Sequence, residues 1–300
     1  VDESGDTDTF TVVLDAQPDS NVVVAISVSD SSESSVNSPL TFTSANWDTP
    51  QVVTITGVDD DIIDGTITST VTVSVVDASS DNNFDAVADQ TVSVTTTDDD
   101  VAGFTIAETS GSTGVDESGS TDIFTVVLNA EPSSNVVLDI TSSDTGEATV
   151  TSSLTFTSAN WDTAKTVTVT GVDDDIIDGT QTSTITVSII DGISDNAFDA
   201  VADQTVSVTT TDDDVAGFTI AETSGSTGVD ESGSTDIFTV VLNAEPSSNV
   251  VLDITSSDTG EATVTSSLTF TAANWDTAQS VTVTGVDDDI VDGSVTSTIT

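Results

Sequence analysis

The chain lacks cysteine, methionine, histidine and tyrosine among its 300 residues, and Lys165 is its single basic residue. Without cysteine and histidine, the sequence excludes disulfides, thiol chemistry and the acid–base or metal chemistry of imidazole. One positive charge is not enough to neutralise phosphates, so we expect no nucleic-acid partner. No apolar run approaches the roughly 18 residues of a membrane span, so we expect none.

Acidic residues are abundant instead, with 53 Asp and Glu and a formal net charge of −52. Such a charge is common in disordered chains, but here 35% of the residues are hydrophobic and they fall in alternating runs. We therefore expect a folded scaffold whose self-repulsion makes its stability depend on cations or ionic strength. A salty or calcium-rich exterior suits such a chain, which favours a secreted protein at the cell surface.

The sequence is a tandem array. Val-Asp-Glu-Ser-Gly at residues 1–5 recurs at 115–119 and 229–233, an interval of 114 residues. This interval is the size of a small domain that can close its own core. We expect an excerpt of a longer array, divided into residues 1–100 without a lead-in strand, a complete repeat at 101–214, and residues 215–300 without the closing strand and Asp triplet.

Apolar residues alternate with a period of two, which is typical of half-buried strands. Val22, Val24, Ile26 and Val28, for example, lie on one face of their run. The pattern predicts about seven strands per repeat, near residues 10–14, 22–28, 40–42, 53–55, 71–75 and 92–94, with 104–107 as a lead-in. Short strands rich in Val and Thr indicate an all-β fold of tandem immunoglobulin-like antiparallel β-sandwiches, arranged as a rod.

One tryptophan recurs in each repeat, as Trp47, Trp161 and Trp275. A functional interpretation makes these residues a platform for stacking sugars. A single tryptophan per sandwich is more often an anchor that closes one end of the core, and we favour that structural role.

Three acidic clusters recur at predicted strand ends. In the first repeat, Glu3 precedes the first strand, Asp59, Asp60 and Asp61 with Asp64 follow the strand at 53–55, and an Asp triplet at 98–100 closes the repeat. Loops at alternate strand ends of a sandwich gather at one pole, where Asp30 is a further candidate. Carboxylates about 4 Å apart repel by roughly 4 kcal/mol per pair at a surface-like dielectric, so the clustering predicts bound cations.

Calcium is the natural occupant, because it takes about six to eight oxygen ligands in flexible geometry. Magnesium demands a stricter octahedron, and the spacing matches neither an EF-hand nor a Gly-rich β-roll. The alternative is that the Asp runs are solvated turns, as we expect for Asp77, Asp81, Asp85 and Asp89. The position of three clusters at strand ends favours calcium.

The opening Val1-x-Glu3-x-Gly5, the strand followed by three Asp, and the closing Asp triplet resemble the Calx-β domain. This family comprises the calcium-binding modules of sodium–calcium exchangers and tandem repeats of very large secreted bacterial surface proteins. The resemblance implies Calx-β-type sandwiches with Ca²⁺ bound by Glu3, Asp59, Asp60, Asp61, Asp98, Asp99 and Asp100; by Glu117, Asp173, Asp174, Asp175, Asp212, Asp213 and Asp214; and by Glu231, Asp287, Asp288 and Asp289. Where the exchanger modules continue with Glu, this chain has Ile62-Ile63-Asp64, which leaves the number of ions and the role of Asp64 open.

We expect an extracellular structural region, a calcium-stiffened stalk or filament of a giant bacterial adhesin, surface or matrix protein. Its partners are neighbouring repeats and other copies in a filament, and the sequence identifies no adhesive target. A calcium-binding regulatory sensor is the alternative. Catalysis is not expected: paired carboxylates can serve a glycosidase, but each pair recurs in copies and no His, Tyr or Cys accompanies it.

Overall fold

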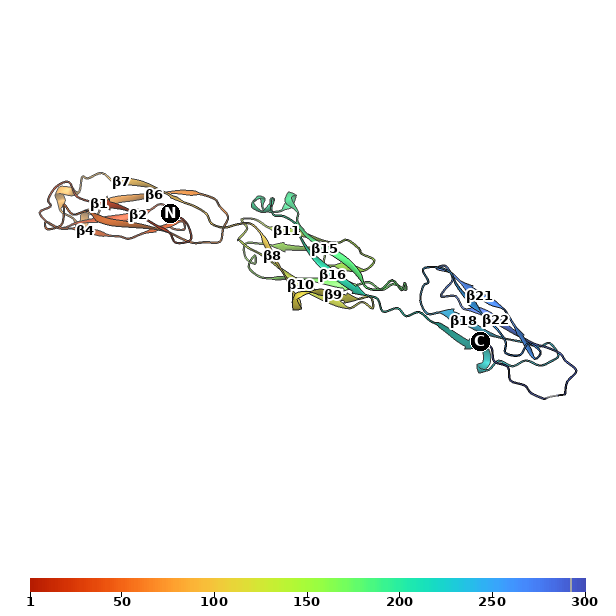
Figure 1. The fold of residues 1–300 in the computed structure, drawn as a ribbon. Coiled ribbons are helices and arrows are strands. Elements are labelled where there is room, and N and C mark those ends of the chain that lie inside the picture. Colours follow the sequence, from red (N-terminus) through yellow and green to blue (C-terminus); the bar gives the residue numbers. More distant parts are fainter. Residues whose placement is uncertain (292) are drawn as a thin grey trace.

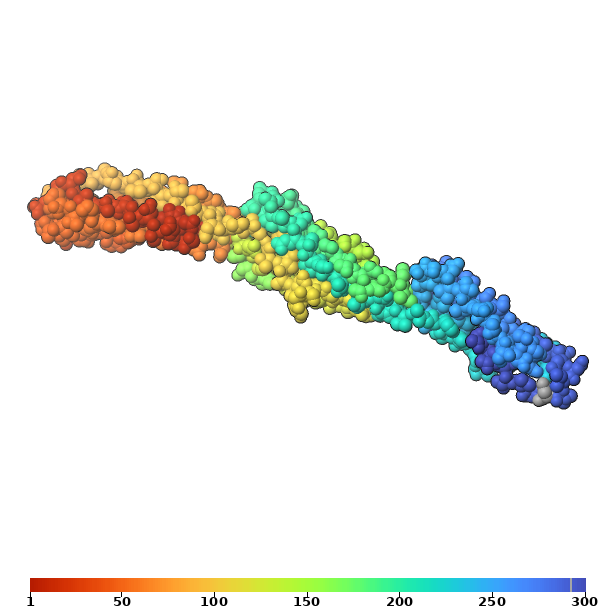
Figure 2. All heavy atoms as spheres, in the orientation of Figure 1, coloured from red at the N-terminus to blue at the C-terminus, as the bar shows by residue number. Residues whose placement is uncertain are grey.

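The computed structural model describes residues 1–291 and 293–300. Three β-sandwiches follow one another end to end in an elongated, gently bent molecule (Figures 1 and 2). The tandem all-β class and the rod-like arrangement predicted from the sequence are confirmed. Within the described residues, no helix is long and apolar enough to cross a membrane.

The complete second repeat shows the architecture best. Its elements are β8 (Phe104–Glu108), η3 (Thr109–Gly111), β9 (Thr113–Asp116), β10 (Thr121–Leu128), β11 (Val136–Ser142), β12 (Ala148–Val150), β13 (Ser153–Phe156), β14 (Lys165–Gly171), β15 (Gln181–Ile189), η4 (Asp191–Ile193), η5 (Asn196–Phe198) and β16 (Gln204–Thr211). One sheet has the order β12-β14-β10-β8 and the other β13-β11-β15-β16-β9. All pairs are antiparallel except β16 with β9, which is parallel.

The sequence predicted about seven strands, whereas this repeat has nine. The predicted lead-in corresponds to β8, and after the turn η3 a further strand, β9, joins the other sheet. The second addition, β12, is only three residues long, too short to show a period. Both extra strands arise from pairing with a partner distant in sequence, which local periodicity does not report.

The first and third repeats contain fewer strands. The first has β1 (Thr7–Val12), β2 (Val22–Val28), β3 (Ser34–Val36), β4 (Leu40–Phe42), β5 (Gln51–Gly57), β6 (Ile67–Val75), η1 (Asp77–Ser79), η2 (Asn82–Phe84) and β7 (Gln90–Thr96). The third has β17 (Phe218–Glu222), η6 (Thr223–Gly225), β18 (Thr235–Leu242), β19 (Val250–Asp253), β20 (Ala262–Val264), β21 (Ser267–Phe270) and β22 (Gln279–Gly285). Their sheets are β1-β5-β3 with β4-β2-β6-β7, and β17-β18-β22-β20 with β19-β21.

Alternating apolar residues bury one face of each strand. In β11, Val136, Leu138 and Ile140 are buried, while the residues between them are not. Each repeat encloses its own hydrophobic cluster between its two sheets. Trp161 and Trp275 pack against the second and third clusters, in agreement with the structural role favoured from the sequence.

Gly171 at the end of β14 is required by a close approach of the backbone. A Cβ at this position would lie 2.1 Å from the carbonyl oxygen of Asp116, well inside van der Waals contact. Gly57 and Gly285 meet Asp2 and Asp230 in the same way. The glycine therefore allows the turn after β9 to cover the end of β14, which places Glu117 over the end of the sandwich.

Successive repeats contact one another through the loop that follows β5 or β14. At the first junction, the Glu131 N–H donates to the carbonyl oxygen of Asp61 at 2.7 Å, and Ile62 forms a parallel bridge with Glu131. The side chain of Ile63 packs against the core cluster of the second repeat. At the second junction, Glu245 donates to the carbonyl of Asp175 at 2.6 Å. The repeats are thus docked, and the residues between Asp100 and Phe104 do not act as a flexible spacer.

The loop that follows β5, β14 or β22 carries an apolar residue at its tip. This residue is covered to a different extent in each of the three repeats. Ile63 is half-buried, Ile177 is 43% exposed and Val291 is 103% exposed. The three positions carry nearly the same loop sequence. Their difference in burial therefore comes from what packs on them.

We expect Ile63→Ser to destabilise the first junction by about 1 kcal/mol, since a half-buried isoleucine loses apolar contacts. This corresponds to a fall of a few degrees in one unfolding midpoint, measured by scanning calorimetry. Val291→Ser is the matched control and should stay within about 0.5 kcal/mol of the parent. Equal losses in the two variants would show that Ile63 does not stabilise the junction.

Candidate metal centre

The acidic clusters converge at the end of each sandwich where the chain leaves for the next repeat. In the second repeat four loops contribute: the turn between β9 and β10 carries Glu117, the loop between β11 and β12 carries Glu147, the loop after β14 carries Asp174 and Asp178, and the chain after β16 carries Asp214. The predicted gathering of loops at one pole is therefore observed.

Glu117 lies at the centre of this cluster. Its N–H donates to the carbonyl of Thr211 at 3.1 Å, which extends the pairing of β9 with β16 and fixes the direction of the side chain. The residue is 0% exposed, and neither carboxylate oxygen has a hydrogen-bond partner. Glu3 occupies the same place in the first repeat, is 1% exposed and has one buried oxygen without a partner. A buried carboxylate without a donor is costly unless a proton or a cation accompanies it.

Carboxylate oxygens from these loops lie within 4.8 Å of one another in groups of three. The groups are Glu3 with Asp98 and Asp100, Glu3 with Glu33 and Asp64, Glu117 with Asp174 and Asp214, and Glu117 with Glu147 and Asp178. Each of the first two repeats thus contains two overlapping groups that share one buried glutamate. The donors are all carboxylate oxygens, the ligand type that hard divalent cations take.

The Asp runs contribute only part of their residues to these groups. Asp174 is half-buried, while Asp173 and Asp175 on either side are exposed. In the closing triplet the order is reversed, with Asp212 and Asp214 half-buried and Asp213 exposed. These runs lie in the loops after β14 and β16, and within each run neighbouring residues differ in burial. The first repeat follows the same pattern, with Asp59, Asp61 and Asp99 exposed.

Hydrogen bonds hold two of the loops together. Asp212 accepts from the N–H of Gly179 at 2.7 Å through one oxygen and from the N–H of Asp214 at 2.8 Å through the other. Gly179 has φ +75, a conformation that glycine adopts readily. Asp98 makes the same two bonds in the first repeat, with Gly65 and Asp100. The loop after β14 is thereby tied to the chain after β16.

Sequence reasoning missed Glu33 and Glu147, and it left Asp64 open. The structure brings all three into the cluster. A signal for the glutamates was present: Asp-x-x-Glu recurs at 30–33, 144–147 and 258–261, although the residues between change. Asp30, the further candidate, belongs to none of the groups, but its charge helps raise the pKa of Glu33 after the larger effect of burial.

The expectation that Asp81 is a solvated turn residue is wrong. Asp81 is 5% exposed and accepts hydrogen bonds from the N–H groups of Asp19, Ser20 and Asn83. Its counterpart Asp195 is 6% exposed and binds Ser133, Ser134 and Ala197. These carboxylates tie a short helix to the neighbouring turn, so they have a structural role away from the acidic pole.

The third repeat presents a less complete cluster. Glu231 is half-buried rather than buried, and of Asp287, Asp288 and Asp289 only the middle one is half-buried. Asp292, the counterpart of Asp64 and Asp178, lies outside the described residues. Among the residues of this repeat that the structure describes, no three acidic side chains form a group like those above.

Burial and mutual repulsion shift the proton affinity of the clustered acids. Burial, followed by the charges of Asp98 and Asp60, raises the pKa of Glu3 to about 7. Burial followed by Asp174 and Asp212 raises the pKa of Glu117 to about 7. Burial, then Asp98, raises the pKa of Asp100 to about 6. The pKa values of Glu33, Asp64, Glu147 and Asp214 are raised as well, first by burial.

No protein-family model matches the chain, and no characterised protein matches its sequence significantly. Among solved structures, the chain is similar to domains 4 and 5 of the S-layer protein SbsC, with 20% identity, a TM-score of 0.31, and coverage of 63% of this chain and 70% of that one. It is similar to the apo form of the Calx CBD1 domain, with 16% identity, a TM-score of 0.28, and coverage of 37% and 98%. For CBD12 from CALX1.2 the values are 12%, 0.29, 69% and 95%. At such scores these likenesses identify no family, and the candidate metal centre rests on the chain's own geometry.

In the presence of a chelator, we expect the chain to lose stability as the pH rises from about 4.5 to about 7. Over this window the folded state retains protons on Glu3 and Glu117 that the unfolded chain has released, so raising the pH favours unfolding; above about 7 the effect ends. Thermal unfolding at pH 5 and pH 8 measures the difference.

The general repulsion of an acidic chain acts in the same direction, so a matched control is needed. Glu3→Gln with Glu117→Gln removes the two glutamates whose pKa values are raised to about 7, whereas Asp59→Asn with Asp173→Asn removes two exposed charges from nearby loops. The first double variant should reduce the dependence of stability on pH, and the second should leave that dependence unchanged. Identical profiles for both variants would contradict the assignment to the buried glutamates.

Proposed function

We propose that this chain is a calcium-binding structural segment of an extracellular protein. In this proposal the repeats form a rod, stiffened by calcium at its junctions, that serves as the stalk or filament of a large adhesin, surface or matrix protein. The observation that carries the proposal is Glu117: a fully buried carboxylate with no hydrogen-bond donor, surrounded by acids from three other loops. Glu3 repeats this arrangement one domain earlier.

The donor set favours calcium over other metals. It consists of carboxylate oxygens in a chain without histidine or cysteine, which disfavours zinc and copper. Loops from four parts of a sandwich supply many oxygens in irregular positions, as calcium accepts and the strict octahedron of magnesium does not. The two overlapping groups in each of the first two repeats support two ions per repeat, with Glu3 or Glu117 shared between them.

Glu3 and Glu117 retain protons because their pKa values are raised to about 7. Calcium would replace these protons in the cluster. Binding to the folded state alone adds stability in proportion to the logarithm of the ligand concentration. A hundredfold excess over the dissociation constant corresponds to roughly 2.7 kcal/mol per site. This gain offsets the repulsion that a net charge of −52 imposes on a folded chain.

A structural role is supported by where the site lies. Asp60 and Asp64 belong to the loop whose Ile62 and Ile63 contact the second repeat, and Asp100 immediately precedes the connection to that repeat. Ordering this loop with an ion would order the junction too. Near-identical copies joined in this way give length at constant geometry. Catalysis is not part of the proposal, since the same carboxylates recur in successive repeats.

The alternative function, a calcium sensor, would use the same link between ion binding and the junction. The affinity for calcium distinguishes a sensor from a structural rod. Calcium sensors bind with dissociation constants of about 10⁻⁷ to 10⁻⁵ M, whereas extracellular modules bind at about 10⁻⁴ to 10⁻³ M. A structural rod in a calcium-rich exterior needs only the weaker range.

We expect calcium at millimolar concentration to raise the unfolding midpoints of the first two repeats, and a chelator to reverse the change. Scanning calorimetry measures the midpoints. On the same samples, small-angle scattering should give a longer and narrower distribution of dimensions with calcium, because ordered loops restrict the junctions. A calorimetric scan that is the same with calcium and with chelator would refute the metal site. Unchanged scattering alone would refute only the stiffening.

A pair of matched variants tests the site residue by residue. Asp174→Asn with Asp214→Asn alters two carboxylates of the group around Glu117, whereas Asp173→Asn with Asp213→Asn alters their exposed neighbours in the same loops. Both variants lose the same charge. We expect the first to weaken calcium binding by the second repeat at least about tenfold, or about 1.4 kcal/mol, and the second to change it little. Titration calorimetry giving equal losses would indicate diffuse attraction rather than a site.

A further inference from the structure

The chain enters the second repeat at one end of the sandwich and leaves it at the other. Glu131 follows β10 and contacts the previous repeat, whereas Asp175 follows β14 and contacts the next one. Because β10 and β14 are antiparallel, these two contacts lie at opposite ends. The repeats follow one another along the molecule (Figure 1), so tension on the chain crosses each sandwich from end to end.

The entering and the leaving parts of the chain are joined directly in the second repeat. The entering part forms β8 and β9, and the leaving part is β16. β9 pairs in parallel with β16 over four residue pairs, from Thr113 with Val208 to Asp116 with Thr211. The N–H of Glu117 adds a bond of 3.1 Å to the carbonyl of Thr211. No other strand lies between β9 and β16, so this ladder is the shortest connection between entry and exit.

The parallel arrangement decides how tension acts on this ladder. Both strands run from the entry end to the exit end. Tension pulls β9 backward through its first residue and β16 forward through its last one, in opposite directions along the strands. The hydrogen bonds cross from one strand to the other, so they are stretched together rather than one after another. Each bond alone contributes little, but sliding the strands requires all of them to break at once.

Side chains reinforce the ladder. The hydroxyl of Thr211 donates to the carbonyl of Val115 and to the carboxylate of Asp116, each at 3.3 Å. Val115 is 5% exposed and Val208 is 0% exposed, and both belong to the core cluster of the second repeat. A slip of one residue would move such side chains from the core to the outer face. The core therefore opposes sliding together with the backbone.

The opposite edge of β9 is fixed as well. The N–H of Gly114 donates to the carboxylate of Asp122 at 3.0 Å, and the N–H of Asp116 donates to the hydroxyl of Ser120 at 2.7 Å. Asp122 belongs to β10, a strand of the other sheet. The entering strand is thus bonded to β16 on one side and to the other sheet on its second side.

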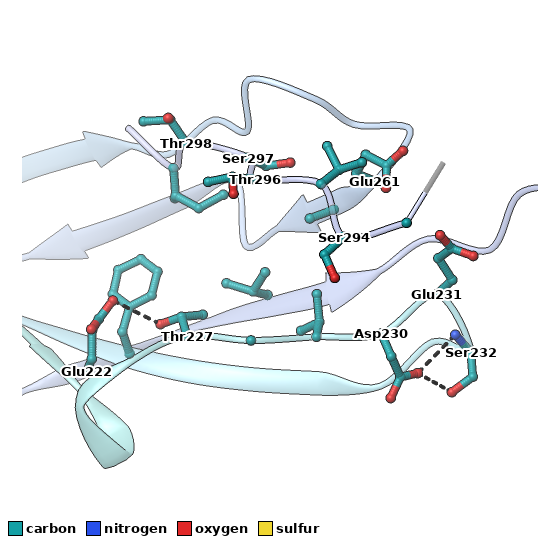
Figure 3. A pocket seen from close by; sticks show the side chains of 18 of the residues that line it. Glu222, Thr227, Asp230, Glu231, Ser232, Glu261, Ser294, Thr296, Ser297 and Thr298 are labelled. Carbon is teal, nitrogen blue, oxygen red and sulfur yellow. Dashed lines mark hydrogen bonds between the residues drawn. The ribbon is translucent and has the colours of Figure 1, made fainter. Parts of the chain in front are cut away.

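The turn after β9 is built by local hydrogen bonds. Asp116 accepts from the N–H of Ser118 at 3.0 Å and from the hydroxyl of the same residue. Figure 3 shows the counterpart of this turn in the third repeat, where Asp230 accepts the same two bonds from Ser232. These bonds fix the direction in which the chain leaves the strand.

The first repeat contains the same connection between its first and last segments. Asp2 forms a parallel bridge with Thr97, and the N–H of Glu3 donates to the carbonyl of Thr97 at 3.1 Å. The N–H of Thr97 donates to the carbonyl of Val1 at 3.1 Å, and its hydroxyl donates to the carboxylate of Asp2 at 3.1 Å. The parallel pairing therefore recurs with the repeat.

We propose that each repeat is a load-bearing module, in which the parallel pair of its entering and leaving strands resists tension. In the second repeat this pair is β9 with β16. The proposal deepens the structural role proposed above and rests on it, since a stalk or filament carries tension. The candidate metal centre lies at the exit end of the same pair, because Glu117 follows β9 and Asp214 follows β16. An ion bound there would join the two strand ends.

The direction of pulling tests the proposal on the full 300-residue chain, which has no cysteine of its own to compete for attachment. One variant carries Ser112→Cys and Val215→Cys, so that β9 and β16 are held at opposite ends. The other carries Ser118→Cys and Val215→Cys, so that both strands are held at the exit end. The three positions are exposed. Because the Ser118 hydroxyl bonds to Asp116, Ser118→Ala is added to the first variant, and both variants then lack this bond.

Optical tweezers measure the lifetime of the second repeat at constant load, in chelator. We expect the first variant to survive at least about tenfold longer, because forced unfolding follows the unfolding rate and its hydrogen bonds must break together. In the second variant the same bonds open one at a time. Without load the two variants should unfold at the same temperature. Equal lifetimes under load, or a longer lifetime of the second variant, would overturn the proposal.

The same measurement with calcium separates the load-bearing pair from the calcium site. Calcium should lengthen the lifetime of the first variant further, since the ion would connect Glu117 to Asp214 across the pair. A lifetime that depends on direction but not on calcium would support the load-bearing pair and contradict the calcium site. A lifetime that depends on calcium but not on direction would support the calcium site and overturn the load-bearing pair.

Discussion

Repulsion among carboxylates at one end of each sandwich is the constraint on which the rest of the structure depends. A buried glutamate, Glu3 or Glu117, sits among acidic loops with no basic side chain nearby, since Lys165 is the only one in the chain and lies on β14. At neutral pH such an arrangement persists only if protons or cations compensate the charge. The least favourable interactions of the chain therefore lie at a place where a divalent ion would convert them into favourable ones.

The position of this constraint links ion binding to the shape of the molecule. The loop after β14 carries Asp174 and Asp178 toward the cluster, and its Asp175 carbonyl accepts a hydrogen bond from Glu245 of the next repeat. A loop of a few residues therefore has contacts on both sides of the junction. Because these contacts are short, movement of the loop and movement between repeats are not independent. This physical link is what supports a stiffened rod in preference to separate domains on flexible linkers.

The closing strand has a similar double role. β16 completes the core through Val206 and Val208, pairs with β9 beside it, and leads into Asp212 and Asp214. The core, the sheet edge and the candidate metal centre thus rely on one segment. In the third repeat, whose described residues include no counterpart of β16, residues 227–230 form no strand and Glu231 is half-buried. In the second repeat this strand lies between β15 and β9, so it joins two parts of one sheet.

The sequence by itself determined the repeat length, the all-β class and the end of the sandwich at which acids gather, because alternation of Val with Thr and the position of Asp runs after strands are local properties of the chain. Only the tertiary structure decided which acids face inward. Asp174 and Asp214 do so while Asp173 and Asp213 do not, a difference between neighbouring residues of a loop that composition cannot report. The structure also brought Glu147 to Glu117 from a distant loop and revealed Asp195 as a buried tie between turns. Burial and proximity arise from pairing across the sheets, so the chemistry of these carboxylates was set by neighbours far away in sequence.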